Sequence, residues 1–177
     1  MLAPGSPRLR YRGTVADDRE LLTYEDFGRA ARELANLIAV DGFRPDAIVA
    51  IARGGLTLAG ALGYALDVKM LGSLNVEFYR GVGETRDEPI VLPPTLDRDA
   101  LAGKSILLVD DVADSGRTLA LVLQLLEAGG GEVRTVCLYA KPQTVQEPDY
   151  VWRRTDRWIL FPWSSEGPVA YPSASGA

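Results

Sequence analysis

Three carboxylates and two hydroxyls are concentrated in one short stretch of the chain, VDDVADSGRT at residues 109–118. Asp110 and Asp111 stand near the end of an apolar run that begins at Ile106, and such a run predicts a buried strand. A polar loop follows, and apolar residues then recur at helical spacing over 119–126. Carboxylates can bind hydroxyls or a divalent cation, whereas a glycine and the backbone N–H groups at a helix start can bind phosphate. The stretch therefore predicts a site for a phosphorylated ligand.

This stretch differs from the familiar phosphate-binding motifs. A Walker A loop is excluded because Gly103-Lys104-Ser105 precedes the strand and Arg98 stands where the first glycine should be, and no GxGxxG is present in the stretch. The simpler interpretation is a strand, a turn and a helix with an Asp or Ser cap. A cap needs one such residue, so three carboxylates with two hydroxyls favour a site.

Polar residues also follow the other predicted strands. Arg53-Gly54-Gly55 comes after the apolar run 47–52, and Lys141 comes after the apolar run 133–140. Ligands in parallel α/β sheets bind at the carboxyl ends of the strands, so we expect these residues to converge with the carboxylates. Simpler interpretations stay open at this point. Residues 53–55 could form a plain turn, and Lys141 could be a surface lysine whose apolar methylene groups pack against the protein. The aromatic residues from Trp158 to Trp163 could be a core cluster.

The remaining pattern predicts the elements that position these residues. Thr23 with Asp26 resembles a capping box before a helix over 24–40. Leu58, Leu62 and Leu66 recur at helical spacing and predict a second helix. A further strand is expected within 68–79. Strands that alternate with helices predict an α/β fold, a parallel sheet with helices on both faces. The glycine- and proline-rich segment 80–94 is expected to be a mobile loop with a short strand near 89–92.

Composition limits the classes of protein. The 177 residues, 47% of them hydrophobic, suffice for one domain, and the net charge of -5 argues against a general nucleic-acid or anionic-membrane surface. Because the chain has no histidine, a carboxylate is the best source of a general base. Its single cysteine, Cys137, excludes an intrachain disulfide and is expected to be buried. No apolar run is long enough for a signal peptide or a membrane span, so we expect a soluble, cytoplasmic protein.

Taken together, these motifs resemble the type I phosphoribosyltransferases. A hydrophobic strand, two acids, two small residues and Asp-Ser/Thr-Gly-x-Thr form that family's motif for phosphoribosyl diphosphate (PRPP), and VDDVADSGRT matches every position. ARGG resembles the family's pyrophosphate loop. AKP and WI..PW resemble the base-binding end of bacterial xanthine-guanine and hypoxanthine phosphoribosyltransferases. The similarity extends over about residues 24–163.

The resemblance implies a fold and an activity. The fold is the single-domain type I phosphoribosyltransferase fold over residues 21–165, with a flexible lid loop and a small C-terminal hood, between a flexible N-terminal arm (1–20) and a tail (166–177). The activity is transfer of the ribosyl 5-phosphate of PRPP to a 6-oxopurine (hypoxanthine, guanine or xanthine), with Mg²⁺ and release of pyrophosphate, in purine salvage. PRPP and a purine base are the implied partners, with no nucleic acid or membrane, in a homodimer or homotetramer. The alternative is a regulatory protein of the same fold that binds PRPP or a nucleotide without turnover.

The resemblance also assigns roles to single residues. Asp114 is the implied catalytic general base, and Trp163 is left to packing. A cis peptide bond is implied between Ala52 and Arg53. Related lid loops carry a Ser-Tyr pair, for which Phe78-Tyr79 is the nearest counterpart here. The implied ligand contacts are Asp110 and Asp111 for the ribose and the metal, Asp114, Ser115, Gly116, Arg117 and Thr118 for the 5′-phosphate, Arg53, Gly54 and Gly55 for pyrophosphate, and Lys141, Trp158 and Ile159 for the base.

Overall fold

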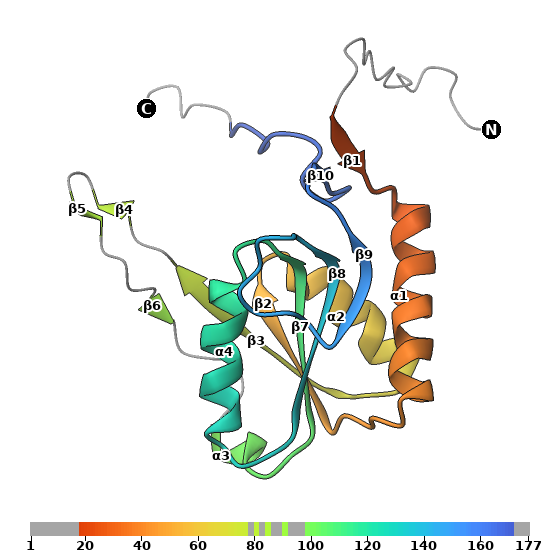
Figure 1. Ribbon diagram of the computed structural model, residues 1–177, viewed down its shortest axis with the longest axis vertical. Helices are drawn as coiled ribbons and strands as arrows, with labels where there is room; N and C mark the ends of the chain where they lie inside the picture. Colours follow the sequence, from red (N-terminus) through yellow and green to blue (C-terminus); the bar gives the residue numbers. More distant parts are fainter. Residues whose placement is uncertain (1–17, 78–79, 82–83, 86–89, 92–97, 172–177) are drawn as a thin grey trace, which may run out of the picture.

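The computed structural model describes residues 18–77, 80–81, 84–85, 90–91 and 98–171. A six-stranded sheet forms the centre of these residues, and its strand order is β6-β3-β2-β7-β8-β9 (Figure 1). All neighbouring strands are parallel except β6, which pairs antiparallel with β3. The strands are β2 (Ala47–Ala52), β3 (Met70–Glu77), β6 (Ile90–Val91), β7 (Ile106–Ala113), β8 (Val133–Ala140) and β9 (Tyr150–Arg154). The predicted parallel α/β architecture is confirmed.

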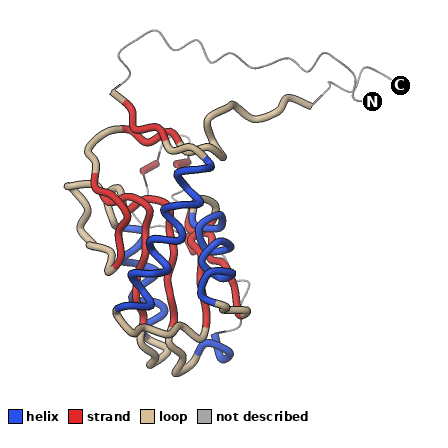
Figure 2. The backbone as a smooth tube through the Cα atoms, turned by 90° about the vertical axis from the view of Figure 1, so that its right-hand side faces the viewer, coloured by secondary structure: helices blue, strands red, loops and turns tan. Residues whose placement is uncertain are grey.

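Helices cover both faces of this sheet (Figures 1 and 2). The helices are α1 (Tyr24–Val40), α2 (Gly55–Leu66), the short α3 (Arg98–Leu101) and α4 (Arg117–Glu127). Along β2, Ile48 and Ala50 pack with α1 and α2, whereas Val49 and Ile51 share the opposite core with α4. This alternation follows from the two-residue period of a strand, and it makes the central strands apolar throughout. No helix in the described ranges has the length and apolar character that crossing a membrane would require.

The strand order creates a topological switch point between β2 and β7. The chain enters the sheet at β2, moves outward to β3, and then returns to the other side of β2 for β7, β8 and β9. The loops after β2 and β7 therefore leave their strands in opposite directions. Such a switch point is the usual ligand site of an open α/β sheet. The residues 53–55 and 110–118 come from these two strand ends.

A separate two-stranded parallel sheet joins the two ends of the described chain. β1 (Arg19–Leu21) pairs with β10 (Trp158–Leu160). The sequence had suggested that Arg19 and Glu20 belong to an N-terminal arm, but they instead pair with Trp158 and Ile159. Local patterns gave no sign of this pairing because its two strands are far apart in the chain.

The structure adds short elements that the sequence did not predict. β9 is one of them, and β4 (Arg80–Gly81) pairs with β5 (Glu84–Thr85) in the segment expected to be a loop. β9 is short and ends in two exposed arginines, so its apolar signal is weak. β6 agrees with the short strand expected near 89–92. Phe78-Tyr79, most of the predicted lid, residues 1–17 of the arm and residues 172–177 of the tail lie outside the described residues.

The start of α1 provides a test of local stability. Thr23 Oγ1 accepts a hydrogen bond from the Asp26 N–H at 3.0 Å, which satisfies one of the N–H groups that lack partners within the helix. We expect Thr23→Ala to lower the free energy of unfolding by about 1 kcal/mol, as measured by urea denaturation. Thr23→Ser keeps the oxygen and is the matched control. An equal loss in both variants would contradict the capping role.

Candidate active site

Two adjacent carboxylates lie near the carboxyl end of β7. Asp110 and Asp111 are both partly buried, and the Asp111 N–H donates to Asp110 Oδ1 at 2.9 Å. Burial raises the pKa of Asp110 well above its ordinary value, and the neighbouring Asp111 carboxylate raises it further. Burial also raises the pKa of Asp111, although hydrogen bonds from backbone and side-chain groups act against this shift. Two like charges at this depth favour a cation or a proton as a counter-charge.

The loop after β2 approaches these carboxylates closely. A Cβ atom on Gly54 would lie 2.1 Å from Asp111 Oδ2, and one on Gly55 would lie 2.3 Å from the Val109 carbonyl oxygen. Only glycine fits at either position without displacing β7 or its carboxylate. The Ala52–Arg53 peptide bond is cis, as the resemblance implied, and Arg53 is exposed. The structure thus brings the predicted 53–55 loop against the predicted acidic pair.

The loop after β7 leads directly into α4. Asp114 and Ser115 are exposed, and Gly116 has φ +75°, a left-handed conformation that favours glycine. α4 begins at Arg117, and Thr118 lies in its first turn. The first N–H groups of a helix have no partners within it, and together with the helix dipole they attract anions.

Lys141 and β10 form the other side of the site. Lys141 is only 8% exposed, and its Nζ donates a hydrogen bond to the Arg157 carbonyl, immediately before β10. The next residue, Trp158, is 70% exposed, whereas Ile159 is buried. A buried ammonium is thus bonded to the backbone directly before an exposed tryptophan. The interpretation of Lys141 as an ordinary surface lysine is wrong.

Trp163 packs in an aromatic cluster and also affects the acidic pair. It stacks on Phe161 with ring centroids 4.9 Å apart and meets Phe27 edge-on at 5.5 Å. A hydrogen bond from its side chain also acts to lower the pKa of Asp111. The segment after β10 is thereby connected to the acidic pair. The sequence offered no sign of this contact.

A second residue missed by sequence reasoning is Gln143. Its Nε2 donates to Asp114 Oδ1 at 2.7 Å. Its position two residues after Lys141, at the carboxyl edge of the sheet, was the available signal. Other bonds in the same region join the Lys141 N–H to the Ala113 carbonyl and the Val145 N–H to the Ser115 carbonyl, both at 2.9 Å.

The donor set is suited to a hard cation held jointly with a ligand. Among the described residues, no group of three or more His, Cys, Asp or Glu side chains is placed to hold a metal ion. Two adjacent carboxylates nevertheless fit Mg²⁺, which prefers oxygen and usually keeps water and substrate phosphate among its ligands. Asp110 and Asp111 are the residues that would hold it.

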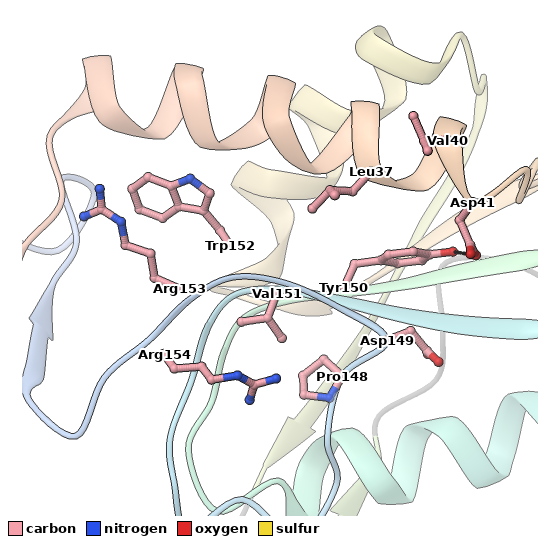
Figure 3. A pocket seen from close by; sticks show the side chains of 10 residues that line it. All are labelled: Leu37, Val40, Asp41, Pro148, Asp149, Tyr150, Val151, Trp152, Arg153 and Arg154. Carbon is pink, nitrogen blue, oxygen red and sulfur yellow. Dashed lines mark hydrogen bonds between the residues drawn. The ribbon is translucent and has the colours of Figure 1, made fainter.

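A groove of about 740 Å³ lies elsewhere, between the end of α1 and β9 (Figure 3). None of the predicted site residues lines it. Its charged side chains already have partners within the chain: Arg154 pairs with Glu147, Asp149 accepts from Thr135, and Arg153 lies over the Trp152 ring. The groove therefore offers no comparable chemistry.

Comparison with known proteins decides the family. Residues 19–167 match the model of the phosphoribosyl transferase domain. The chain belongs to the phosphoribosyltransferase family. It is 36% identical over 147 residues to the xanthine-guanine phosphoribosyltransferase of Gluconobacter oxydans, covering 81% of this chain and 83% of that one.

Solved structures agree with this assignment. The purine phosphoribosyltransferase of Pyrococcus horikoshii superposes with a TM-score of 0.73 and 38% identity, over 88% of this chain and 99% of that one. The xanthine-guanine-hypoxanthine phosphoribosyltransferase of Helicobacter pylori gives 0.70 and 25%, over 82% and 94% of the two chains. The present chain is thus a phosphoribosyltransferase enzyme of the expected fold.

In this phosphoribosyltransferase, the fit around Gly116 can be tested without substrate. A Cβ there would lie 2.2 Å from Thr144 Oγ1 and 2.7 Å from the Gln146 backbone nitrogen, whereas Gly103, at φ +68°, has open space around it. We expect Gly103→Ala to cost about 1–2 kcal/mol from its left-handed backbone alone, and Gly116→Ala to cost more. Urea denaturation measures both, and equal losses would show that the contact with residues 144–146 is unimportant for stability.

Proposed function

We propose that this enzyme transfers the 5-phosphoribosyl group of PRPP to a 6-oxopurine and releases pyrophosphate, in purine salvage. The observation that carries the proposal is the bond of the buried Lys141 ammonium to the Arg157 backbone carbonyl, directly before the exposed Trp158. Relatives named for xanthine, guanine and hypoxanthine support the same substrate class. The regulatory alternative has less support because Lys141 and Trp158 are both present.

The phosphorylated substrate would lie at the carboxyl ends of β2 and β7. Asp110 and Asp111 would accept hydrogen bonds from the ribose hydroxyls, and the N–H groups and hydroxyls of residues 114–118 would bind the 5′-phosphate. Arg53 and the N–H groups of Gly54 and Gly55 would bind the pyrophosphate and stabilise the charge it develops on leaving. Mg²⁺ held with Asp110 and Asp111 would supply further counter-charge.

Asp114 would take the proton in the reaction. A nitrogen of the purine imidazole ring forms a bond to the ribose C1′, the bond from C1′ to the pyrophosphate oxygen breaks, and the proton carried by the imidazole ring is transferred to Asp114. As an exposed carboxylate at the start of the proposed phosphate-binding residues 114–118, Asp114 has the accessibility that this role requires. The chain has no histidine that could act instead.

Lys141 would select the base. A lysine ammonium has three donors and no acceptor, so it matches the 6-oxo group of hypoxanthine, guanine or xanthine. Adenine presents an amino group at that position, which cannot accept from the ammonium. Trp158 would stack on any flat base and would add affinity without selecting among them.

Turnover with a panel of bases tests the proposal. We expect activity with PRPP, Mg²⁺ and 6-oxopurines, no efficient use of adenine, and loss of activity with a chelator that returns when Mg²⁺ is added back. The repulsion between three carboxylates and the substrate phosphates is the reason for the metal requirement. Binding of PRPP without turnover on any base would favour the regulatory alternative.

Substitution of Lys141 tests the selectivity separately. Lys141→Met keeps the apolar stem and removes the donor, so we expect kcat/KM on 6-oxopurines to fall at least about tenfold, corresponding to one hydrogen bond from a charged group. Lys69→Met, at an exposed position on the loop before β3, is the matched control. Unchanged turnover in Lys141→Met would place recognition of the 6-position elsewhere.

A further inference from the structure

The segment that follows β8 runs alongside residues 113–116, called the phosphate loop below for its proposed role, and contacts it at successive residues. Lys141 bonds to Ala113, Gln143 to Asp114 and Val145 to Ser115, with donor to acceptor distances of 2.9, 2.7 and 2.9 Å. The close approach of Thr144 to Gly116 continues the series. Residues 141–145 therefore form a strap that fixes the position of residues 113–116.

One bond in this series differs from the others because it is made between side chains. Both Gln143 and Asp114 are exposed, so burial does not force their side chains together. The amide Nε2 donates to one carboxylate oxygen, Oδ1, at a distance typical of a strong bond to a charged acceptor. The second carboxylate oxygen can then serve another partner.

We propose that Gln143 is a positioning residue that holds Asp114 in the orientation needed to receive the proton from the purine base. This inference rests on the proposed function. Left alone, an exposed aspartate samples several rotamers, and only some of them direct an oxygen toward the base. A bond to Gln143 reduces that freedom before the substrate arrives.

Glutamine suits this task because its amide neither gains nor loses a proton at neutral pH. A lysine or arginine at the same position would form an ion pair with Asp114 and make it a weaker base. An acidic residue would repel it. Since Gln143 lies two residues after Lys141, the same strap positions the proposed acceptor of the proton and the proposed donor to the 6-oxo group.

Isosteric substitutions of Gln143 test the proposal. We expect Gln143→Met, which keeps the length of the side chain but removes the donor, to lower kcat about tenfold, as for one hydrogen bond to a charged group. Gln143→Glu should lower kcat further, because it places a carboxylate against Asp114. The KM for PRPP should change less than about twofold in both variants, since the phosphate loop keeps its backbone bonds. Gln124→Met and Gln124→Glu, at an exposed position of α4, are the matched controls and should leave kcat unchanged.

A double-mutant cycle shows whether Gln143 acts through Asp114. Asp114→Asn alone should lower kcat about 10²–10⁴-fold, the range for loss of a general base. In that background, Gln143→Met should cause no further loss, whereas an equal loss in both backgrounds would overturn the proposal. Unchanged kcat in the Gln143 variants would also overturn the proposal. So would decreases in kcat that correlate with decreases in the melting temperature and do not follow the expected order, in which kcat falls from wild type to Gln143→Met to Gln143→Glu. A wild-type protein without turnover would refute the proposed function itself, and this inference with it.

Discussion

The parallel pairing of β2 with β7 at the centre of the sheet is the constraint on which the site depends. Ala50 of β2 is paired with Val109 of β7, so the ends of the two strands lie side by side. The residues that follow β2 must therefore lie close to those at the end of β7. Glycine at positions 54 and 55 allows one strand end to approach the carboxylates of the other, and any side chain there would separate them.

The surroundings of the acidic pair disfavour its ionised form. Burial raises the pKa of both Asp110 and Asp111, and the Asp111 carboxylate raises the pKa of Asp110 further. The hydrogen bond from Trp163 and the Asp111 N–H relieve only part of this cost. Binding of a cation and of ribose hydroxyls would relieve more of this cost. Burial would therefore favour the binding of these groups by the two ionised carboxylates. Stability is commonly lost in this way at sites built for binding.

Two further connections join the separate parts of the site. The strap at residues 141–145 connects the lysine at the end of β8 to the loop at residues 113–116, and the Arg157 carbonyl connects that lysine to the start of β10. β10 in turn pairs with β1, so the exposed Trp158 ring is supported by a strand from the other end of the chain. A shift of the small β1-β10 sheet would therefore move Trp158 and Ile159 together.

The parts of this protein that could be predicted are those whose structure depends on residues close together in the sequence. The strands 47–52 and 133–140, the helix 24–40 and the passage from β7 through the loop into α4 depend on apolar periodicity and turn residues within a few positions, so the sequence was sufficient for them. Only the tertiary structure revealed the pairing of β1 with β10, strand β9, the contact of Trp163 with Asp111, and the bond of Gln143 to Asp114. These features join residues that lie 14 or more positions apart, and hydrophobic periodicity carries no information about which distant segments meet.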